Sequence, residues 1–182
     1  MKLRIIILEF LILVLACGAA ACSRRQSVNE SNSLSSTPPT PELNWPELGP
    51  PVKVEPGILF HEVALNRAGA TLRVWVYLPE HHEGTVPAIL IAPAGSPLLY
   101  GKRLGAGDRP EHLPYVRAGF AVIAYDVEGA VGRGATESEI IKGAKAFEAA
   151  GYGVADARFA LDYALARVPW IDPAKVIAAG HS

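Results

Sequence analysis

Three runs of mostly apolar residues stand out after residue 85, at 86–95 (VPAILIAPAG), 119–126 (GFAVIAYD) and 175–180 (KVIAAG). Unbroken apolar runs of this length are typical of strands that are covered on both faces, as in a parallel sheet with helices on either side. A strand with one solvated face would instead alternate apolar and polar residues. The three runs therefore predict buried strands at the centre of a sheet.

The segments between these runs carry helical patterns. Residues 114–119 predict a short helix that starts near Pro114 and stops at Gly119. Thr136 and Glu139 have the spacing of a capping box, which predicts a helix up to Gly151. A further helix before Pro169 is predicted by one apolar face, made of Val154, Ala157, Leu161, Ala164, Leu165 and Val168. Strands that alternate with helices indicate the α/β class.

Two segments upstream, 57–66 and 70–80, alternate apolar and polar residues and are separated by Asn66-Arg67-Ala68-Gly69. This pattern predicts an antiparallel hairpin. We therefore expect a hairpin that leads into a mostly parallel sheet.

The N-terminus has the layout of a secretory signal peptide: Lys2 and Arg4, a short apolar stretch and then small residues. The apolar stretch at 10–21 is shorter than the roughly 20 residues that span a bilayer as a helix. Ala19-Ala20-Ala21-Cys22 resembles a bacterial lipobox, which implies that 1–21 is removed and that Cys22 is lipidated. Cys17 is a second candidate, and an ordinary signal peptide is the alternative.

Residues 22–56 are rich in Ser, Asn and Pro and predict a flexible tether ahead of a domain at 57–182. With Cys22 as the first mature residue, the remaining chain has no further cysteine, so we expect no disulfide.

The charge pattern narrows the range of functions. The net charge is −1, from 17 basic and 18 acidic residues, and no basic cluster extends beyond Arg24–Arg25, so we expect no nucleic-acid partner. No residues have convincing metal-ligand spacing, and the glycine-rich stretches 105–108 and 129–134 lack the pattern of a phosphate loop. We therefore expect neither a metal nor a cofactor.

At its end the third apolar run leads into Gly180-His181-Ser182. In α/β-hydrolases the nucleophile lies on a sharp strand-to-helix turn with the pattern Gly-x-Ser-x-Gly. From about residue 57 the chain resembles the first half of an α/β-hydrolase of the prolyl-oligopeptidase-like serine peptidase group, and it is also similar to dienelactone-hydrolase-like esterases. The segments that carry the resemblance are 86–95, 115–134 and 156–182.

The resemblance implies an α/β-hydrolase sheet that reaches the nucleophile turn after its fifth strand. It implies that Ser182 attacks the carbonyl of a small ester or peptide, and that an acid and a histidine follow later in the sequence. It also implies that Ala94 and Gly95 supply part of the oxyanion hole, although Pro93-Ala94-Gly95-Ser96 replaces the group's His-Gly-Gly-Pro. The alternative for Ala94 and Gly95 is a tight strand exit. We expect the 182 residues alone to be inactive.

Other polar residues are expected to be structural. The acid of this fold follows the nucleophile in sequence, so Asp126 is predicted to brace the loop after its strand. His61 and His112 are predicted to be surface or loop residues, and neither is placed to act as a base.

The sequence is consistent with two alternative functions. One is an exported serine hydrolase, anchored by lipid in the outer membrane and facing the periplasm of a Gram-negative cell. The alternative is a non-catalytic surface lipoprotein, or a binding module, derived from a hydrolase.

Overall fold

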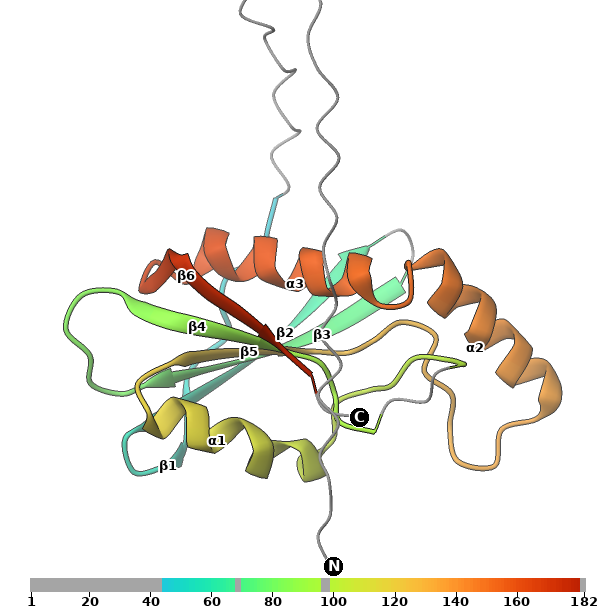
Figure 1. Cartoon of the computed structure of the whole chain (residues 1–182), viewed down its shortest axis with the longest axis horizontal. Coiled ribbons are helices and arrows are strands. Elements are labelled where there is room, and N and C mark those ends of the chain that lie inside the picture. The colour runs from blue at the N-terminus through green and yellow to red at the C-terminus, as the bar shows by residue number, and fades with distance from the viewer. Residues whose placement is uncertain (1–43, 68–69, 96–98, 181–182) are drawn as a thin grey trace, which may run out of the picture. The chain divides into compact units, whose positions relative to one another are not determined.

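The computed structural model describes residues 44–67, 70–95 and 99–180 (Figure 1). The predicted signal peptide, Cys22 and the first part of the predicted tether lie outside the described residues. So do His181 and Ser182.

The described residues form one mixed sheet with helices on both faces. Its strands are β1 (Val52–Glu55), β2 (Ile58–Arg67), β3 (Ala70–Pro79), β4 (Val86–Ile91), β5 (Ala121–Tyr125) and β6 (Ile171–Ala179). The helices are α1 (Arg109–Arg117), α2 (Glu137–Ala149) and α3 (Val154–Arg167), and a 3-10 turn, Ala106–Asp108, precedes α1. The strands lie in the order β1-β2-β3-β5-β4-β6.

Strand direction confirms the predicted class. β2 and β3 form the predicted antiparallel hairpin, in continuous register from Ile58 opposite Pro79 to Arg67 opposite Ala70. β3 is antiparallel to β5, whereas β4 is parallel to both β5 and β6. Four of the six strands, β2, β4, β5 and β6, therefore run in one direction.

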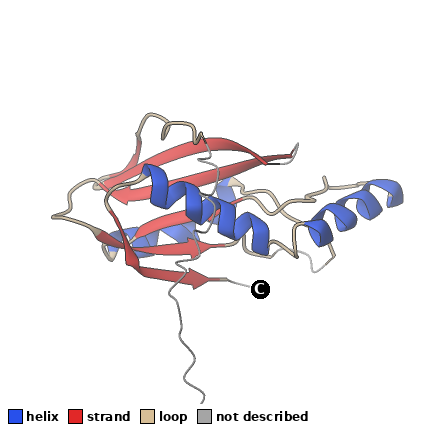
Figure 2. Cartoon of the chain, turned by 90° about the horizontal axis from the view of Figure 1, so that it is seen from above, coloured by secondary structure: helices blue, strands red, loops and turns tan. Residues whose placement is uncertain are grey.

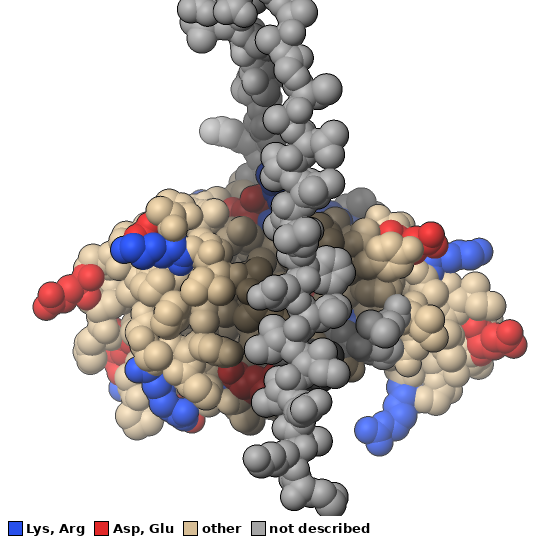
Figure 3. Space-filling model, in the orientation of Figure 1, with Lys and Arg blue, Asp and Glu red and all other residues tan. Residues whose placement is uncertain are grey.

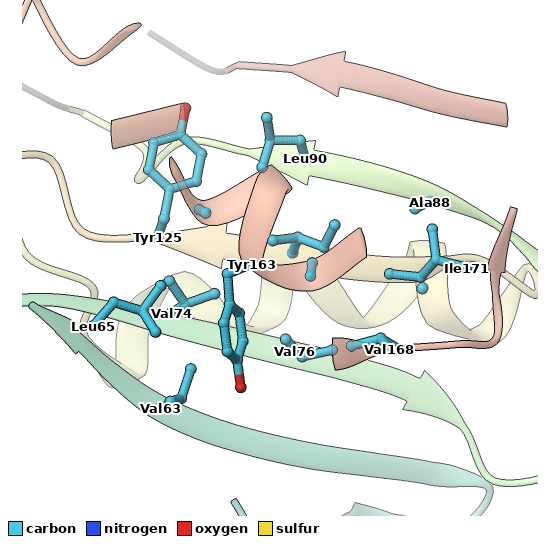
Figure 4. Packing of buried hydrophobic residues seen from close by; sticks show 14 of the residues in the cluster. Val63, Leu65, Val74, Val76, Ala88, Leu90, Tyr125, Tyr163, Val168 and Ile171 are labelled. Carbon is cyan, nitrogen blue, oxygen red and sulfur yellow. The ribbon is translucent and has the colours of Figure 1, made fainter. Parts of the chain in front are cut away.

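The hydrophobic core has two parts, one on each face of the sheet. Successive residues of β3 point to opposite faces, so Val74 and Val76 belong to one part and Trp75 and Tyr77 to the other. On the first face the sheet packs against α3, whose Tyr163 is fully buried among strand side chains (Figure 4). On the other face it packs against α1 (Figure 1). α2 projects beyond the end of the sheet (Figure 2) and buries only Gly143 and Phe147.

The starts of two helices can be compared with prediction. α1 begins at Arg109, with Pro110 in its first turn, so Pro114 lies inside the helix and not at its start. The capping box of Thr136 and Glu139 is confirmed at the start of α2.

The predicted apolar face of α3 is partly wrong. Val154 is 71% exposed and Leu165 37% exposed, whereas Asp156, Ala160, Tyr163 and Ala164 are buried. The two alanines allow the helix to approach the sheet closely, and the ion pair of Asp156 with Arg67 fixes the rotation of the first turns.

The structured part also begins earlier than the predicted boundary at residue 57. The indole of Trp45 packs against the rings of Phe159 and Tyr163, with centroids 4.8 and 5.7 Å away. β1 then pairs with β2 and adds a sixth strand to the five expected. Part of the segment predicted as tether is therefore docked on the domain.

The sequence before the predicted nucleophile forms β6. The predicted strand at 175–180 is confirmed up to Ala179, but its pairing with β4 already starts at Ile171. The register jumps from Ile171 opposite Val86 to Val176 opposite Ala88, so residues 172–175 bulge out of the ladder. Asp172 accepts the Ala174 N–H across this bulge at 3.0 Å.

Candidate functional site

The carboxyl ends of three strands meet at one edge of the sheet. β4 is parallel to β5 and to β6, so Ala94–Gly95 after β4, Asp126 after β5 and Gly180 after β6 share this edge. The Ala92 N–H donates to the Ala179 carbonyl oxygen, at 3.4 Å, where β4 and β6 end. In open α/β sheets, ligands bind outside the carboxyl ends of the strands.

The predicted oxyanion residues therefore follow a strand that is hydrogen-bonded to the strand ahead of Ser182. The structure brings the Ala94–Gly95 loop to this edge, while the position of Ser182 is not described. Gly95 has φ +62°, in the left-handed region that glycine adopts without strain. The Ala94 carbonyl accepts a hydrogen bond from the Lys102 amine. This loop is compatible both with an oxyanion role and with a tight strand exit.

Asp126 braces the loops, as predicted. Its side chain is buried and accepts three hydrogen bonds: from Arg73 Nε at 3.1 Å, from Arg73 Nη2 at 3.2 Å and from the Leu104 N–H at 2.6 Å. The hydrogen bond with Asp126 raises the pKa of Arg73. Asp126 therefore ties β3 and the segment around Leu104 to the end of β5, and its lone pairs are engaged within the fold.

A cleft of about 710 Å³ opens beside Gly95, between the segment at 100–103 and the loop after β5. Its lining residues are Gly95, Tyr100, Gly101, Lys102, Arg103, Ala130, Val131, Gly132 and Arg133. A second hollow of about 510 Å³ shares Gly95, Lys102 and Arg103. Both volumes are in the range of small-molecule sites, which are commonly about 300–1,000 Å³.

The charged residues in the described lining of the cleft are cations. Among the described residues, its lining contains the cations Lys102, Arg103 and Arg133 and no carboxylate. On the face shown in Figure 3, acidic and basic side chains are interspersed around the rim, with no large cluster of one sign.

The prediction that His61 and His112 are surface or loop residues is wrong. His61 lies in β2 and is 7% exposed, and its Nδ1–H donates to the Gly49 carbonyl at 2.6 Å. His112 lies in α1 and is 1% exposed, with its ring against those of Trp75 and Tyr77. Burial lowers the pKa of His112, so its neutral form is favoured. Both histidines are engaged in the fold.

Two polar contacts within the fold were not predicted. Asp156 is fully buried and accepts hydrogen bonds from Arg67, at 2.5 Å, and from the Glu128 N–H, at 2.8 Å. It thereby links α3 to the hairpin and to the loop after β5. The second contact is that of Lys102 with Ala94. Asp156 does not stand out in the sequence, because its partner Arg67 lies far away along the chain. Lys102 does not stand out because it lies in a loop without periodicity.

Metal sites and membrane spans are both absent from the part of the chain that the structure describes. Within 44–67, 70–95 and 99–180, no three His, Cys, Asp or Glu side chains are grouped so that they could hold a metal ion. In the same ranges, no helix has the length and hydropathy needed to cross a membrane.

Comparison with known proteins identifies the fold. No family model matches the chain, and neither does any of the curated proteins. Among solved structures, a cold-adapted esterase from an Arctic intertidal metagenomic library has a TM-score of 0.52 at 17% identity, over 76% of this chain and 55% of that one. A dienelactone hydrolase-like promiscuous phosphotriesterase from metagenomic libraries has a TM-score of 0.51 at 24% identity, over 68% of this chain and 49% of that one.

The fold is that of the α/β-hydrolases. The chain spans about half the length of the two solved structures, so the activity of a whole protein of this kind is a matter for proposal. One is described as an esterase and the other as a dienelactone hydrolase-like phosphotriesterase, and neither is described as a peptidase. The resemblance to dienelactone-hydrolase-like esterases is thus supported at the level of fold, whereas that to prolyl-oligopeptidase-like peptidases gains no support from these two.

Proposed function

We propose that this protein is a serine hydrolase that cleaves small esters, with Ser182 as its nucleophile. The observation that carries the proposal is the Ala92–Ala179 hydrogen bond at the common end of β4 and β6. Through it, the Ala94–Gly95 loop lies beside the strand that runs into Gly180-His181-Ser182. This is the arrangement that an oxyanion loop and a nucleophile turn require.

In the proposed reaction, the Ser182 hydroxyl attacks the ester carbonyl and a histidine takes its proton. The carbonyl oxygen becomes an oxyanion, which is bound by the N–H after Ser182 and by an N–H of the Ala94–Gly95 loop. The alcohol leaves with the proton from the histidine, and water then hydrolyses the acyl-enzyme. The histidine and its acid are expected beyond residue 182, in chain order Ser, acid, His.

The finer features are also proposals. An ester is favoured over a peptide because both similar structures are esterases or related to dienelactone hydrolases. We further propose that the protein is exported and anchored through a lipid on Cys22, in the outer membrane of a Gram-negative cell. The motif Ala19-Ala20-Ala21-Cys22 supports the anchor.

The test uses a form of the protein that extends beyond residue 182 to the length of its structural neighbours. We expect it to react with a fluorophosphonate probe and to hydrolyse p-nitrophenyl acetate. Ser182→Ala should abolish both reactions, because the proposed mechanism has no other nucleophile. Ser138→Ala removes an exposed serine of α2 and should change neither.

Two results would contradict the proposal. One is probe labelling that persists in Ser182→Ala. The other is a folded, extended protein that neither labels nor hydrolyses esters, which would favour the non-catalytic surface lipoprotein instead.

A further inference from the structure

Lys102 connects the ends of β4 and β5, through its side chain and its backbone carbonyl respectively. Its Nζ donates to the Ala94 carbonyl oxygen and lies 3.7 Å from Asp108 Oδ1. We propose that Lys102 is a positioning residue: by holding the Ala94 carbonyl it sets the direction of the Gly95 N–H and keeps that group available to bind an oxyanion. This inference rests on the proposed function.

The peptide between Ala94 and Gly95 is planar and trans. The described residues contain no cis peptide bond, so the Ala94 C=O and the Gly95 N–H point to opposite sides of one planar unit. A donor fixed on the carbonyl therefore turns the N–H away from Lys102. Among the described residues, no backbone acceptor takes the Gly95 N–H, so no described backbone group competes with a ligand for it.

The peptide between Ala94 and Gly95 needs a restraint to keep this orientation. Gly95 adopts φ +62° and is exposed, and glycine populates positive and negative φ about equally. Rotation of the peptide would exchange the N–H for a carbonyl oxygen, whose partial negative charge would repel an oxyanion. The Lys102 amine favours the present orientation, because the rotated peptide would lose a charge-assisted hydrogen bond.

The backbone of Lys102 is itself held in place. Its carbonyl accepts the Val127 N–H at 2.7 Å, just after β5. The preceding Gly101 lies so close to this strand end that a Cβ there would be 1.9 Å from the Glu128 carbonyl oxygen and 2.2 Å from that of Val127. The backbone at Gly101 and Lys102 is therefore fixed to the end of β5.

Asp108 restrains the other end of the side chain. Its side chain is 8% exposed and accepts the Gly105 N–H through Oδ2 at 2.6 Å, which leaves Oδ1 toward the Lys102 amine. The ammonium group thus lies between a fixed anion and the Ala94 carbonyl. Because these two groups hold the Lys102 amine, we attribute its effect on the reaction to the orientation of Gly95.

The test compares Lys102→Met, Lys102→Arg and the control Lys53→Met in the extended protein. Lys53 pairs with Glu80 on the surface and lies in β1. We expect Lys102→Met to lower kcat for p-nitrophenyl acetate about 10- to 100-fold with KM within about twofold, because an oxyanion donor acts in the transition state. Lys102→Arg should restore most of kcat, and Lys53→Met should match the wild type.

A second measurement does not depend on activity. Glycine-selective ¹⁵N labelling reports the Gly95 amide, which should shift or broaden in Lys102→Met and stay near its wild-type position in Lys102→Arg. Unchanged kcat and an unchanged Gly95 amide in Lys102→Met would overturn the inference, as would equal loss in Lys53→Met. An inactive wild type would instead overturn the proposed function, and the amide signal would then decide whether Lys102 holds this peptide.

Discussion

Replacing Asp126 by alanine should destabilise the protein by removing one carboxylate that serves three donors. The Leu104 N–H lies in a buried residue, 3% exposed, and would lose its acceptor. Leaving a buried donor unpaired costs about 1–3 kcal/mol. The Arg73 side chain is 33% exposed, so water would replace its partner, and the lost pair adds at most about 1 kcal/mol.

The expected loss for Asp126→Ala is therefore about 1–4 kcal/mol, a large share of the roughly 5–15 kcal/mol that stabilises a typical domain. Asp126→Asn should lose less, because the amide oxygen can still accept the Leu104 N–H. Asp162→Ala is the control: its carboxylate is exposed and pairs with Arg158, at 3.6 Å, so the change should stay below about 0.5 kcal/mol.

Urea unfolding of the three variants measures these differences. If Asp126→Ala unfolded at the same urea concentration as Asp162→Ala, the bracing function assigned to Asp126 would be refuted. A different result, in which Asp126→Asn folds normally but loses esterase activity, would make Asp126 part of the catalytic machinery.

Two further changes test the packing on each face of the sheet. Burial holds the pKa of His112 below 6.5, so the unfolded chain binds a proton at this imidazole more readily than the folded protein does. The free energy of unfolding should therefore fall as the pH drops below about 6.5, and it should level off below the folded-state pKa. His112→Phe should remove that dependence in urea titrations at about pH 5–7.5, and an unchanged slope would contradict this. Trp45→Ala should cost about 2 kcal/mol, less than a fully buried Trp because Trp45 is half-buried, and should increase hydrogen exchange in β1. Stability within about 0.5 kcal/mol of wild type would mean that the Trp45 contact contributes little.

Short-range patterns predict most of this sheet because a few neighbouring residues determine them. The apolar runs of β4 and β5, the alternation of β2 and β3 and the Thr136–Glu139 box are each complete within one short segment. The start of α1 is predicted too late because a proline favours the first turn of a helix, and two prolines compete for that position. Pro110 occupies it, and Pro114 lies inside the helix.

Long-range contacts explain the other differences. The buried face of α3 depends on Trp45 and Arg67, which lie about a hundred residues earlier and cannot be read from the helix pattern. The resemblance predicts the position of Ala94 and Gly95 at the strand ends. It does not predict their link to Lys102, which depends on how the loop at 99–105 folds back against β5. His112 is misplaced for a similar reason, since its burial depends on Trp75 and Tyr77 of β3.

The order of strands has a consequence for biosynthesis. β4 lies between β5 and β6, and both partners follow it in the chain. At a synthesis rate of about 5–20 residues per second, about 4–18 s separate Ile91 from Ala179. During this interval the apolar β4 has emerged with its second edge unpaired, which is the condition in which β-prone segments associate with other chains. The β2–β3 hairpin can form early, but the edge that carries the Ala94–Gly95 loop is complete only after β6 has been made, and β4 is the segment that a chaperone would have to shield until then.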